Sequence, residues 1–389
     1  MKGGFTINRR RKRPGSIARA IAGVPEHNAD LLYACGYSCA DPIAWLRVRG
    51  RSLLLVGDLE IEGARRTATV DAVVPTSRIA ARLSERRIRG ADLHRIAGEE
   101  LRRRGARRVE VPFSFPAGGI APLRRAGLRV SSAAEPFFPE RSRKSAPEIR
   151  SIRAALRAAE AGLAAAVMTL AASRIGRDRR LRVGKQVLTS EILREIAERA
   201  MFAAGAAPDR SIVAGGIQGA DPHHRGSGPL AAHRPIVLDF FPRDRLTGYY
   251  GDITRTVVKG RADAPTRKAF LAVHEAQRLA FELIRHGAEG SKIHGRLLEF
   301  FRETGYPVRR GGRRREGFFH GTGHGLGLEL HEPPTIGSRP ARLEAGQVIT
   351  VEPGLYYPWL GGMRIEDVVL VTRGGCSRLT RFPVFLEIP

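Results

Sequence analysis

The sequence predicts a two-domain protein of the α/β class, in which strands and helices are interleaved along most of the chain. Three observations support this prediction. The chain has 389 residues, which is enough for two domains of ordinary size. Apolar runs of strand length alternate with Arg-, Ala- and Leu-rich stretches of helical length. A charged stretch at residues 140–144 separates an N-terminal part without clustered catalytic side chains from a C-terminal part that is rich in them.

The N-terminal part is expected to contain two segments. Residues 1–16 read as a flexible basic tail, and residues 17–143 as an α/β domain. Apolar, β-branched runs bounded by polar residues are typical of strands, whereas an amphipathic Arg/Leu-rich stretch is typical of a helix. The expected elements are strands at 52–56, 69–74 and 109–111 and a helix over about 87–104.

The C-terminal part, residues 144–389, is expected to be the catalytic domain. It opens on Ser145-Ala146-Pro147-Glu148, in which Ser145 and Glu148 form a capping box, so a helix is predicted from here to about residue 173. Thr189 or Ser190 is expected to cap a second helix that ends near residue 204. Further helices are expected over 264–286 and 291–305, and strands over 211–215, 235–240, 252–259, 347–352 and 363–371. Within residues 144–389, a pattern of a predicted strand hairpin accompanied by helices appears twice. This repetition suggests an internal duplication.

The composition is that of a globular protein with an excess of arginine. Hydrophobic residues make up 42% of the chain, charged residues 27%, and the formal net charge is +27. Such a charge attracts nucleic acids and anionic membranes, but the basic residues are spread along the chain and no nucleic-acid-binding motif accompanies them. No uninterrupted apolar run of about 18 residues predicts a membrane span. Three scattered cysteines and a basic N-terminus without an apolar core point to the cytoplasm.

Four carboxylates and one histidine are the strongest functional signal. Asp239 and Asp252 lie at the ends of two consecutive apolar runs, and Glu352 and Glu366 lie at the end of one run and within the next. Because each pair flanks a turn-rich stretch, each is expected on adjacent strands of a hairpin. Four converging carboxylates repel one another unless they are protonated or hold cations. Two divalent ions would balance their charge, and His324 would add a nitrogen ligand that manganese, cobalt, iron or zinc accepts.

The segment from His320 to Pro334 is the second signal. It contains three histidines (His320, His324 and His331) among many glycines, which allow the backbone to approach a ligand closely. Histidine is the usual proton carrier near neutral pH. Taken alone, the three histidines are also compatible with a hydrogen-bonded structural set.

Together these segments resemble the pita-bread metallopeptidases, the family that includes prolidase, aminopeptidase P and methionine aminopeptidase. The resemblance implies a pita-bread catalytic domain, and all five of the family's metal ligands are matched in order. A weaker likeness at residues 30–33 and 54–57 implies the creatinase/prolidase-like N-terminal domain that methionine aminopeptidases lack, which favours Xaa-Pro bonds. The matching segments are Leu238-Asp239, 248–256, 320–334, Val351-Glu352-Pro353-Gly354 and Arg364-Ile365-Glu366-Asp367.

The resemblance also implies a metal-binding role for each ligand. Asp239 would bind one ion, His324 and Glu352 would bind the other, and Asp252 and Glu366 would bridge both. Manganese or cobalt is the expected metal, with zinc or iron as the alternative. Water held between the ions would be deprotonated near neutral pH and attack the scissile carbonyl. The turn between Asp239 and Asp252 is two residues longer than is common in the family, a change that a hairpin tip tolerates.

Five catalytic residues are implied in the same way. Glu352 would transfer protons beside its ligand role, and Arg364 would orient the ligands. His223 and His331 match histidines that contact substrate and stabilise the tetrahedral intermediate, and His320 matches a further active-site histidine. The adjacent His224 leaves one of these assignments open, although His223 follows a proline as in the family.

The predicted function is therefore metal-dependent hydrolysis of peptides at bonds preceding proline. Alternatives are a non-catalytic binding protein on the same fold, with a nucleic-acid or protein partner, a metal-free hydrolase of the creatinase type, and an aminopeptidase without proline preference. Retention of all five ligands disfavours the first two. The sequence leaves open whether the protein is a homodimer. The Arg-rich run at residues 309–315 is either a solvated loop or a site that captures the carboxylate of the substrate.

Overall fold

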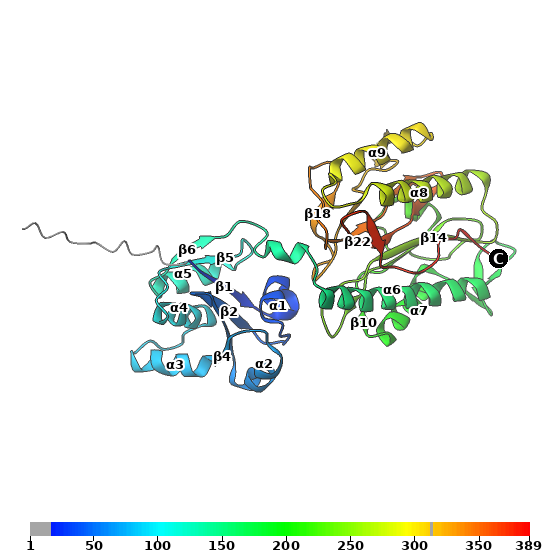
Figure 1. Ribbon diagram of the computed structural model, residues 1–389. Helices are drawn as coiled ribbons and strands as arrows, with labels where there is room; N and C mark the ends of the chain where they lie inside the picture. The colour runs from blue at the N-terminus through cyan, green and yellow to red at the C-terminus, as the bar shows by residue number, and fades with distance from the viewer. Residues whose placement is uncertain (1–16, 312–313) are drawn as a thin grey trace, which may run out of the picture. The chain divides into compact units, whose positions relative to one another are not determined.

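The computed structural model describes residues 17–311 and 314–389, so the expected basic tail lies outside the described residues. The chain divides into two compact units, Met1–Pro139 and Glu140–Pro389 (Figure 1). The division falls a few residues before the expected one because the charged stretch at 140–144 belongs to the second unit. Both Arg141 and Lys144 form ion pairs with Glu332 there.

The first unit is built on a six-stranded mixed sheet with the order β4-β3-β2-β1-β5-β6. The antiparallel pairs are β1–β2 and β2–β3, and the remaining pairs are parallel. The strands are β1 (Ala18–Gly23), β2 (Ile43–Val48), β3 (Arg51–Val56), β4 (Ala72–Pro75), β5 (Arg108–Val111) and β6 (Arg129–Ser132). The helices are α1 (Ala29–Cys35), α2 (Ile61–Thr67), α3 (Thr76–Glu85), α4 (Leu93–Arg103) and α5 (Ala117–Arg125), with short 3-10 turns η1 (Pro25–His27) and η2 (Asp58–Glu60).

Helices cover both faces of this sheet. Alternate residues of β3 face opposite sides, so Leu53 packs with α3, α4 and α5, whereas Leu54 packs with α1 and α2. A strand that is buried on both sides is expected to be a continuous apolar run, as Leu53-Leu54-Leu55-Val56 is. The unit is therefore a three-layer α/β/α sandwich.

The second unit contains the longer helices and several smaller sheets. Its helices are α6 (Ala146–Ala172), α7 (Ser190–Ala203), α8 (Ala264–Leu283) and α9 (Gly290–Glu303), with η4 (Gly216–Ala220), while η3 (Pro139–Ser142) spans the division. A four-stranded sheet has the order β11-β12-β14-β24, from β11 (Ile212–Gly215), β12 (Ile236–Phe240), β14 (Ile253–Lys259) and β24 (Glu387–Ile388). A five-stranded sheet has the order β18-β17-β19-β22-β23, from β17 (Gly323–Gly325), β18 (Glu332–Ile336), β19 (Val348–Val351), β22 (Asp367–Val371) and β23 (Cys376–Arg378).

Smaller ladders complete the unit. They are β7 (Arg174–Ile175) with β8 (Leu181–Val183) and β9 (Gln186–Val187), β10 (Ala206–Ala207) with β13 (Arg243–Asp244), β15 (Arg309–Gly311) with β16 (Arg314–Glu316), and β20 (Gly354–Tyr357) with β21 (Gly361–Arg364).

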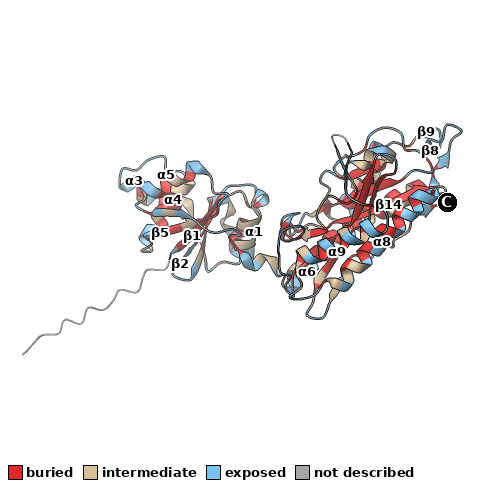
Figure 2. Ribbon diagram, turned by 90° about the horizontal axis from the view of Figure 1, so that it is seen from above, coloured by how far each residue is buried: buried red, intermediate tan, exposed pale blue. Residues whose placement is uncertain are grey.

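Each main sheet of the second unit packs against its own pair of helices. Apolar residues of β12 and β14 form one core with α6 and α7, and those of β19 and β22 form another with α8 and α9. In Figure 1, β14 and β22 lie between the two helix pairs, and in Figure 2 the labelled helices α6, α8 and α9 each have exposed residues on one side and buried residues on another. This repetition of strand pair plus helix pair agrees with the duplication suggested by the sequence.

The predicted start of α6 is confirmed in atomic detail. Ser145 and Glu148 form the capping box, with the Ser145 amide donating to the Glu148 carboxylate at 2.8 Å. Within the described ranges α6 is the one helix long and apolar enough to cross a membrane by length and composition alone, and 44% of its apolar window is buried in the structure. That face packs into the core formed with α7, which accounts for its apolar character.

The long turn between Asp239 and Asp252 leaves the main strand pair undisturbed. Its short strand β13 pairs with β10, and Asp244 Oδ1 accepts hydrogen bonds from the Leu246 and Thr247 amides at 3.1 and 2.7 Å. Gly248 closes the turn with a φ of +78°, which glycine adopts without steric cost. The extra residues are therefore held at the tip, and Asp239 remains opposite Thr254 in the ladder.

Candidate active site

The two carboxylate pairs lie on two neighbouring antiparallel strand pairs. Asp239 is on β12 and Asp252 directly precedes β14, which pairs with β12. Val351 lies opposite Asp367 in the β19–β22 ladder, so Glu352 and Glu366 each lie one residue beyond the same end of that ladder. The Glu366 amide donates to the Thr254 carbonyl at 3.0 Å, which joins the two sheets where the four carboxylates meet.

The expected strand over 363–371 is interrupted at this point. Residues 361–364 form β21, residues 367–371 form β22, and Ile365 and Glu366 lie between them. The break turns the Glu366 side chain toward β14, where one of its oxygens accepts a hydrogen bond from the Thr254 hydroxyl at 2.7 Å. Continuous pairing would have kept Glu366 in the ladder, so the break contributes to the convergence of the carboxylates.

Burial makes this group of carboxylates electrostatically unfavourable on its own. Asp252 is 4% exposed and Glu366 2% exposed. Burial, and then the Glu366 charge, raise the pKa of Asp252 well above its usual range. Burial and the Glu352 charge do the same to the pKa of Glu366, and burial raises the pKa of Glu352 to about 7. Each group is therefore costly to ionise unless a cation is present.

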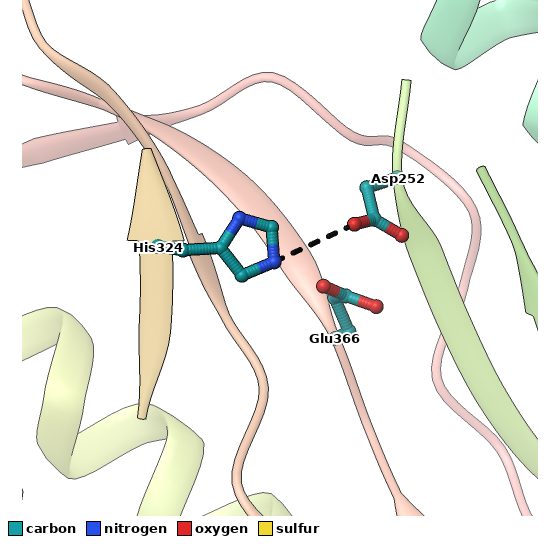
Figure 3. Close-up of side chains that lie close together, drawn as sticks. All are labelled: Asp252, His324 and Glu366. Carbon is teal, nitrogen blue, oxygen red and sulfur yellow. Dashed lines mark ion pairs between the residues drawn. The ribbon is translucent and has the colours of Figure 1, made fainter. Parts of the chain in front are cut away.

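His324 presents a nitrogen lone pair to these carboxylates. Its Nδ1 lies 3.1 Å from the Gly325 carbonyl, and because a carbonyl only accepts, Nδ1 carries the proton. The unprotonated Nε2 lies 3.4 Å from Glu352 Oε1. Figure 3 shows the same nitrogen facing Asp252, whose Oδ2 is 3.8 Å away. Burial lowers the pKa of His324, which favours this neutral form. Fixing the tautomer through the second ring nitrogen is usual for metal-ligating histidines.

This donor set fits a divalent metal ion. Ligand atoms of Asp252, His324 and Glu366 all lie within 4.8 Å of one another, and Figure 3 shows the three side chains pointing toward a common space. Asp239 lines the same cavity, and its buried Oδ1 has no hydrogen-bond partner among the described residues. Oxygen and nitrogen lone pairs that face one another without protons between them are stabilised by a cation.

A hydrogen-bonded chain lies behind the carboxylates. Arg364 donates to Asp239 Oδ2 and, through Nη1, to the Tyr356 hydroxyl at 2.8 Å. His320 Nδ1 lies 2.8 Å from the Gly321 carbonyl and therefore carries the proton, so its Nε2 accepts from the Tyr356 hydroxyl at 2.9 Å. Burial, and then the Arg364 charge, lower the pKa of His320 to about 3, so its ring is neutral. Tyr356 is a site residue that was not predicted from the sequence, where its one signal is its place two residues after Pro353-Gly354.

His331 and His223 face the cavity without belonging to the group of close ligand atoms. His331 is partly exposed to solvent, and its ring lies edge-on to that of His324, with ring centroids 4.2 Å apart. Burial, and then His324, lower the pKa of His331. His223 lines the cavity, whereas His224 Nδ1 accepts a hydrogen bond from the Gly226 amide at 2.9 Å. The two adjacent histidines thus lie in different surroundings.

The predicted residues line one cavity of about 560 Å³. Its walls also include the apolar side chains of Ile212, Phe241, Phe319 and Leu330. The predicted members of the lining are Asp239, Asp252, His324, Glu352, Glu366, His223, His320, His331 and Arg364. The cavity therefore combines a charged floor with an apolar wall.

The Arg-rich run at 309–315 is only partly described. Arg313 lies outside the described residues, whereas Arg315 lines a smaller cavity of about 310 Å³. This smaller cavity shares Asp221, Pro222 and Phe319 with the larger one. Gly317 pairs with Tyr356 of β20, which fixes the end of the β15–β16 hairpin beside the site.

Comparison with known proteins gives one matching family and several similar proteins. The model of metallopeptidase family M24 matches residues 150–373. The Xaa-Pro dipeptidase of Pyrococcus furiosus is 38% identical over 173 residues, which are 44% of this chain and 47% of that protein. The chain thus matches about half the length of such curated relatives.

Solved structures resemble nearly the whole chain. The X-Pro aminopeptidase from Thermotoga maritima has a TM-score of 0.80 at 24% identity and covers 96% of this chain and 97% of its own. The prolidase from Pyrococcus furiosus has a TM-score of 0.74 at 26% identity, with 94% and 96% covered. The predicted fold class, an α/β domain followed by a pita-bread catalytic domain, is confirmed.

Proposed function

Because the chain belongs to metallopeptidase family M24, we propose that it is a metal-dependent peptidase that cleaves peptide bonds preceding proline. The observation that carries the proposal is the group of buried Asp252, buried Glu366 and partly buried His324 in the wall of a cavity of about 560 Å³. The relative named Xaa-Pro dipeptidase and the structural neighbours named X-Pro aminopeptidase and prolidase support the preference for proline.

The donor set supports two ions held by five residues. Asp239 would bind one ion, His324 and Glu352 the other, and Asp252 and Glu366 both. Three or more carboxylates with a single imidazole suit manganese or cobalt, with zinc or iron as the alternative. When bound, such ions lower the pKa of water to near neutrality and polarise a substrate carbonyl.

The protein's own groups would orient the substrate and move protons. Glu352, whose Oε1 lies 3.4 Å from His324 Nε2 in the same cavity, would hold a proton and release it beside its ligand role. His331 and His223 face the cavity and would hydrogen-bond to the substrate at the carbonyl under attack. Arg364 and Tyr356 would hold Asp239 and His320 in place.

The apolar wall of the cavity supports the proline preference. Phe319, Phe241 and Ile212 offer a surface for an apolar ring, and the proline nitrogen has no hydrogen to satisfy when the scissile bond is buried. A substrate residue with a free amide N–H would have to bury that donor against this wall at a cost.

Parallel assays of matched peptides test the proposal. Protein reconstituted with manganese or cobalt is expected to cleave Xaa-Pro dipeptides or Xaa-Pro-initiated tripeptides faster than the same peptides with alanine in place of proline. Removing the metal with a chelator should abolish cleavage, and adding it back should restore it. Equal rates on the proline and alanine series would indicate an aminopeptidase without proline preference. No cleavage by metal-loaded protein would indicate a binding protein.

A second test concerns recognition of the substrate carboxylate by Arg315. We expect Arg315→Gln to raise KM for peptides with a free C-terminal carboxylate more than for their C-terminal amides, because a guanidinium pairs with a carboxylate through parallel hydrogen bonds. The difference should shrink with added salt, since exposed charges are screened over about 10 Å at 0.1 M ionic strength.

Arg309 provides the matched control for this measurement. It is an exposed arginine of the same hairpin and is absent from the residues that line the two cavities. Arg309→Gln removes the same charge and should leave the ratio of the two KM values unchanged. Equal effects of Arg315→Gln on both substrate forms would remove Arg315 from recognition.

A further inference from the structure

The stretch at residues 140–144 supplies two cations to a buried carboxylate of the catalytic unit. Lys144 Nζ lies 2.7 Å from Glu332 Oε2, and the two side chains are 1% and 3% exposed. Arg141 Nη2 lies 2.6 Å from the other oxygen of Glu332. Both oxygens of one carboxylate are thus held by charges that lie 188 and 191 residues away in sequence.

The backbone of the same stretch is attached to the strand that leads to Glu352. The Lys144 amide donates to the Gly346 carbonyl at 2.7 Å, and Arg143 forms a β-bridge with Gln347. Lys144 is therefore presented from a backbone that is itself hydrogen-bonded to the residues before β19.

Glu332 in turn contacts the segment between His324 and His331. It directly follows His331 and begins β18, which pairs with the β17 strand that carries His324. Its Oε1 accepts the Glu329 amide at 3.1 Å, and a Cβ placed on Gly327 would come within 2.6 Å of its Oε2. The loop from Gly327 to His331 thus approaches this carboxylate at Gly327 and at the Glu329 amide before it reaches His331.

We propose that Glu332, clamped by Lys144 and Arg141, is the positioning residue for His331. The clamp sets the distance and angle between the His331 ring and the His324 ring, and it makes the side chains of Arg141 and Lys144 part of the support of the active site. The proposal rests on the proposed function for its kinetic test, but the position of the His331 ring can be measured without any substrate.

Replacing Lys144 with methionine tests the clamp. The change keeps most of the side-chain volume and leaves the Glu332 carboxylate buried with one of its two cations missing, which is costly unless the carboxylate moves. We expect kcat on an Xaa-Pro dipeptide to fall about tenfold or more, because small displacements of a catalytic group have large kinetic effects. KM should change less than kcat, and metal content should be unchanged.

The matched control is Arg143→Gln. Arg143 belongs to the same stretch, but its side chain is 62% exposed and lies 3.8 Å from the exposed Glu344. This variant should keep the kcat of the unmodified protein. Lys144→Arg, which retains the charge, should recover part of the kcat lost in Lys144→Met.

Two further variants separate positioning from general loss of stability. The double variant Lys144→Met, Glu332→Gln removes the carboxylate charge that Lys144→Met leaves with only one cation. The double variant should therefore unfold at a higher temperature than Lys144→Met, while its kcat stays low. Lys144→Met should also have little further effect on kcat in a His331→Ala background, because both changes act through the same ring. The proposal would be overturned if Lys144→Met lowered kcat by the same factor in the unmodified protein and in His331→Ala. An unchanged kcat in Lys144→Met would overturn it as well.

An NMR measurement makes the proposal independent of peptidase activity. The imidazole C–H signals of His331, identified by their disappearance in His331→Ala, should shift in Lys144→Met and stay in place in Arg143→Gln. Unshifted His331 signals in Lys144→Met would refute the clamp. If the signals shift in a protein that cleaves no peptide, the proposed function fails and the positioning role stands.

Discussion

Replacing Asp252 with alanine is expected to remove most of the divalent-metal binding and, with it, the peptidase activity. Asp252 is buried among the ligand atoms of His324 and Glu366, and it is proposed to bridge both ions. Loss of residues that merely support metal ligands costs about 10- to 100-fold in metal affinity, so loss of a bridging ligand should exceed about 100-fold. Metal analysis and titration calorimetry would measure the number of ions and their affinities.

The result can be separated from misfolding. The pKa of Asp252 is raised by burial and by Glu366, so removing this carboxylate relieves repulsion and the metal-free variant should be at least as stable as the metal-free parent. Asp209→Ala removes one exposed carboxylate of the same unit and should bind metal normally. Two ions bound with normal affinity by Asp252→Ala would refute its ligand role, and loss of only one ion would show that it serves a single site.

Local sequence signals were enough to locate the carboxylates on paired strands. Asp239 and Asp252 border apolar runs separated by a turn, and the structure pairs β12 with β14. The same reasoning holds for Glu352 and Glu366, whose strands β19 and β22 pair, although the residues between them form a further ladder, β20–β21. Pairing of neighbouring runs depends on alternation and turn residues, which a sequence displays directly.

The first and last residues of helices were less predictable, because each depends on a single local interaction such as an N-cap hydrogen bond. The helix expected over 87–104 begins only at Leu93, since Asp92 accepts the Arg95 amide at 2.8 Å as its N-cap and Gly90 adopts a φ of +63°. A chain with a positive φ at this position cannot continue a helix. The aspartate and the glycine are visible in the sequence, but the Arg/Leu-rich pattern extends past both of them.

The supporting contacts of the site lie beyond sequence reasoning for a different reason. Tyr356 joins Arg364 to His320, and Lys144 joins Glu332 across 188 residues. Neither contact follows from spacing or residue type, because each depends on how the two sheets and the stretch at 140–144 come together. Lys144 in particular has the sequence context of a charged linker, where a solvated side chain is the usual outcome.

Replacing His331 with alanine is expected to lower kcat by about 10²-fold or more while metal content stays intact. His331 lines the cavity, and its ring lies edge-on to that of His324 with the ring centroids 4.2 Å apart. It does not belong to the group of close ligand atoms formed by Asp252, His324 and Glu366. Burial, and then His324, lower its pKa, so the ring is neutral near pH 7 and can either accept a proton or donate its N–H to a developing oxyanion. Steady-state kinetics on an Xaa-Pro dipeptide, together with metal analysis, would measure both quantities.

A glutamine variant and a control histidine decide between the two chemical roles. Glutamine keeps a hydrogen-bond donor but cannot take up or release a proton at neutral pH. His331→Gln should therefore retain more kcat than His331→Ala if the ring stabilises an oxyanion, and no more if it transfers protons. His286→Ala changes an exposed histidine whose Nδ1 accepts the Ala345 amide at 3.3 Å, and it should leave kcat unchanged. An unchanged kcat in metal-loaded His331→Ala would leave the ring with a packing role against His324. The clamp formed by Lys144 and Glu332 would then have no kinetic consequence, so the two measurements constrain each other.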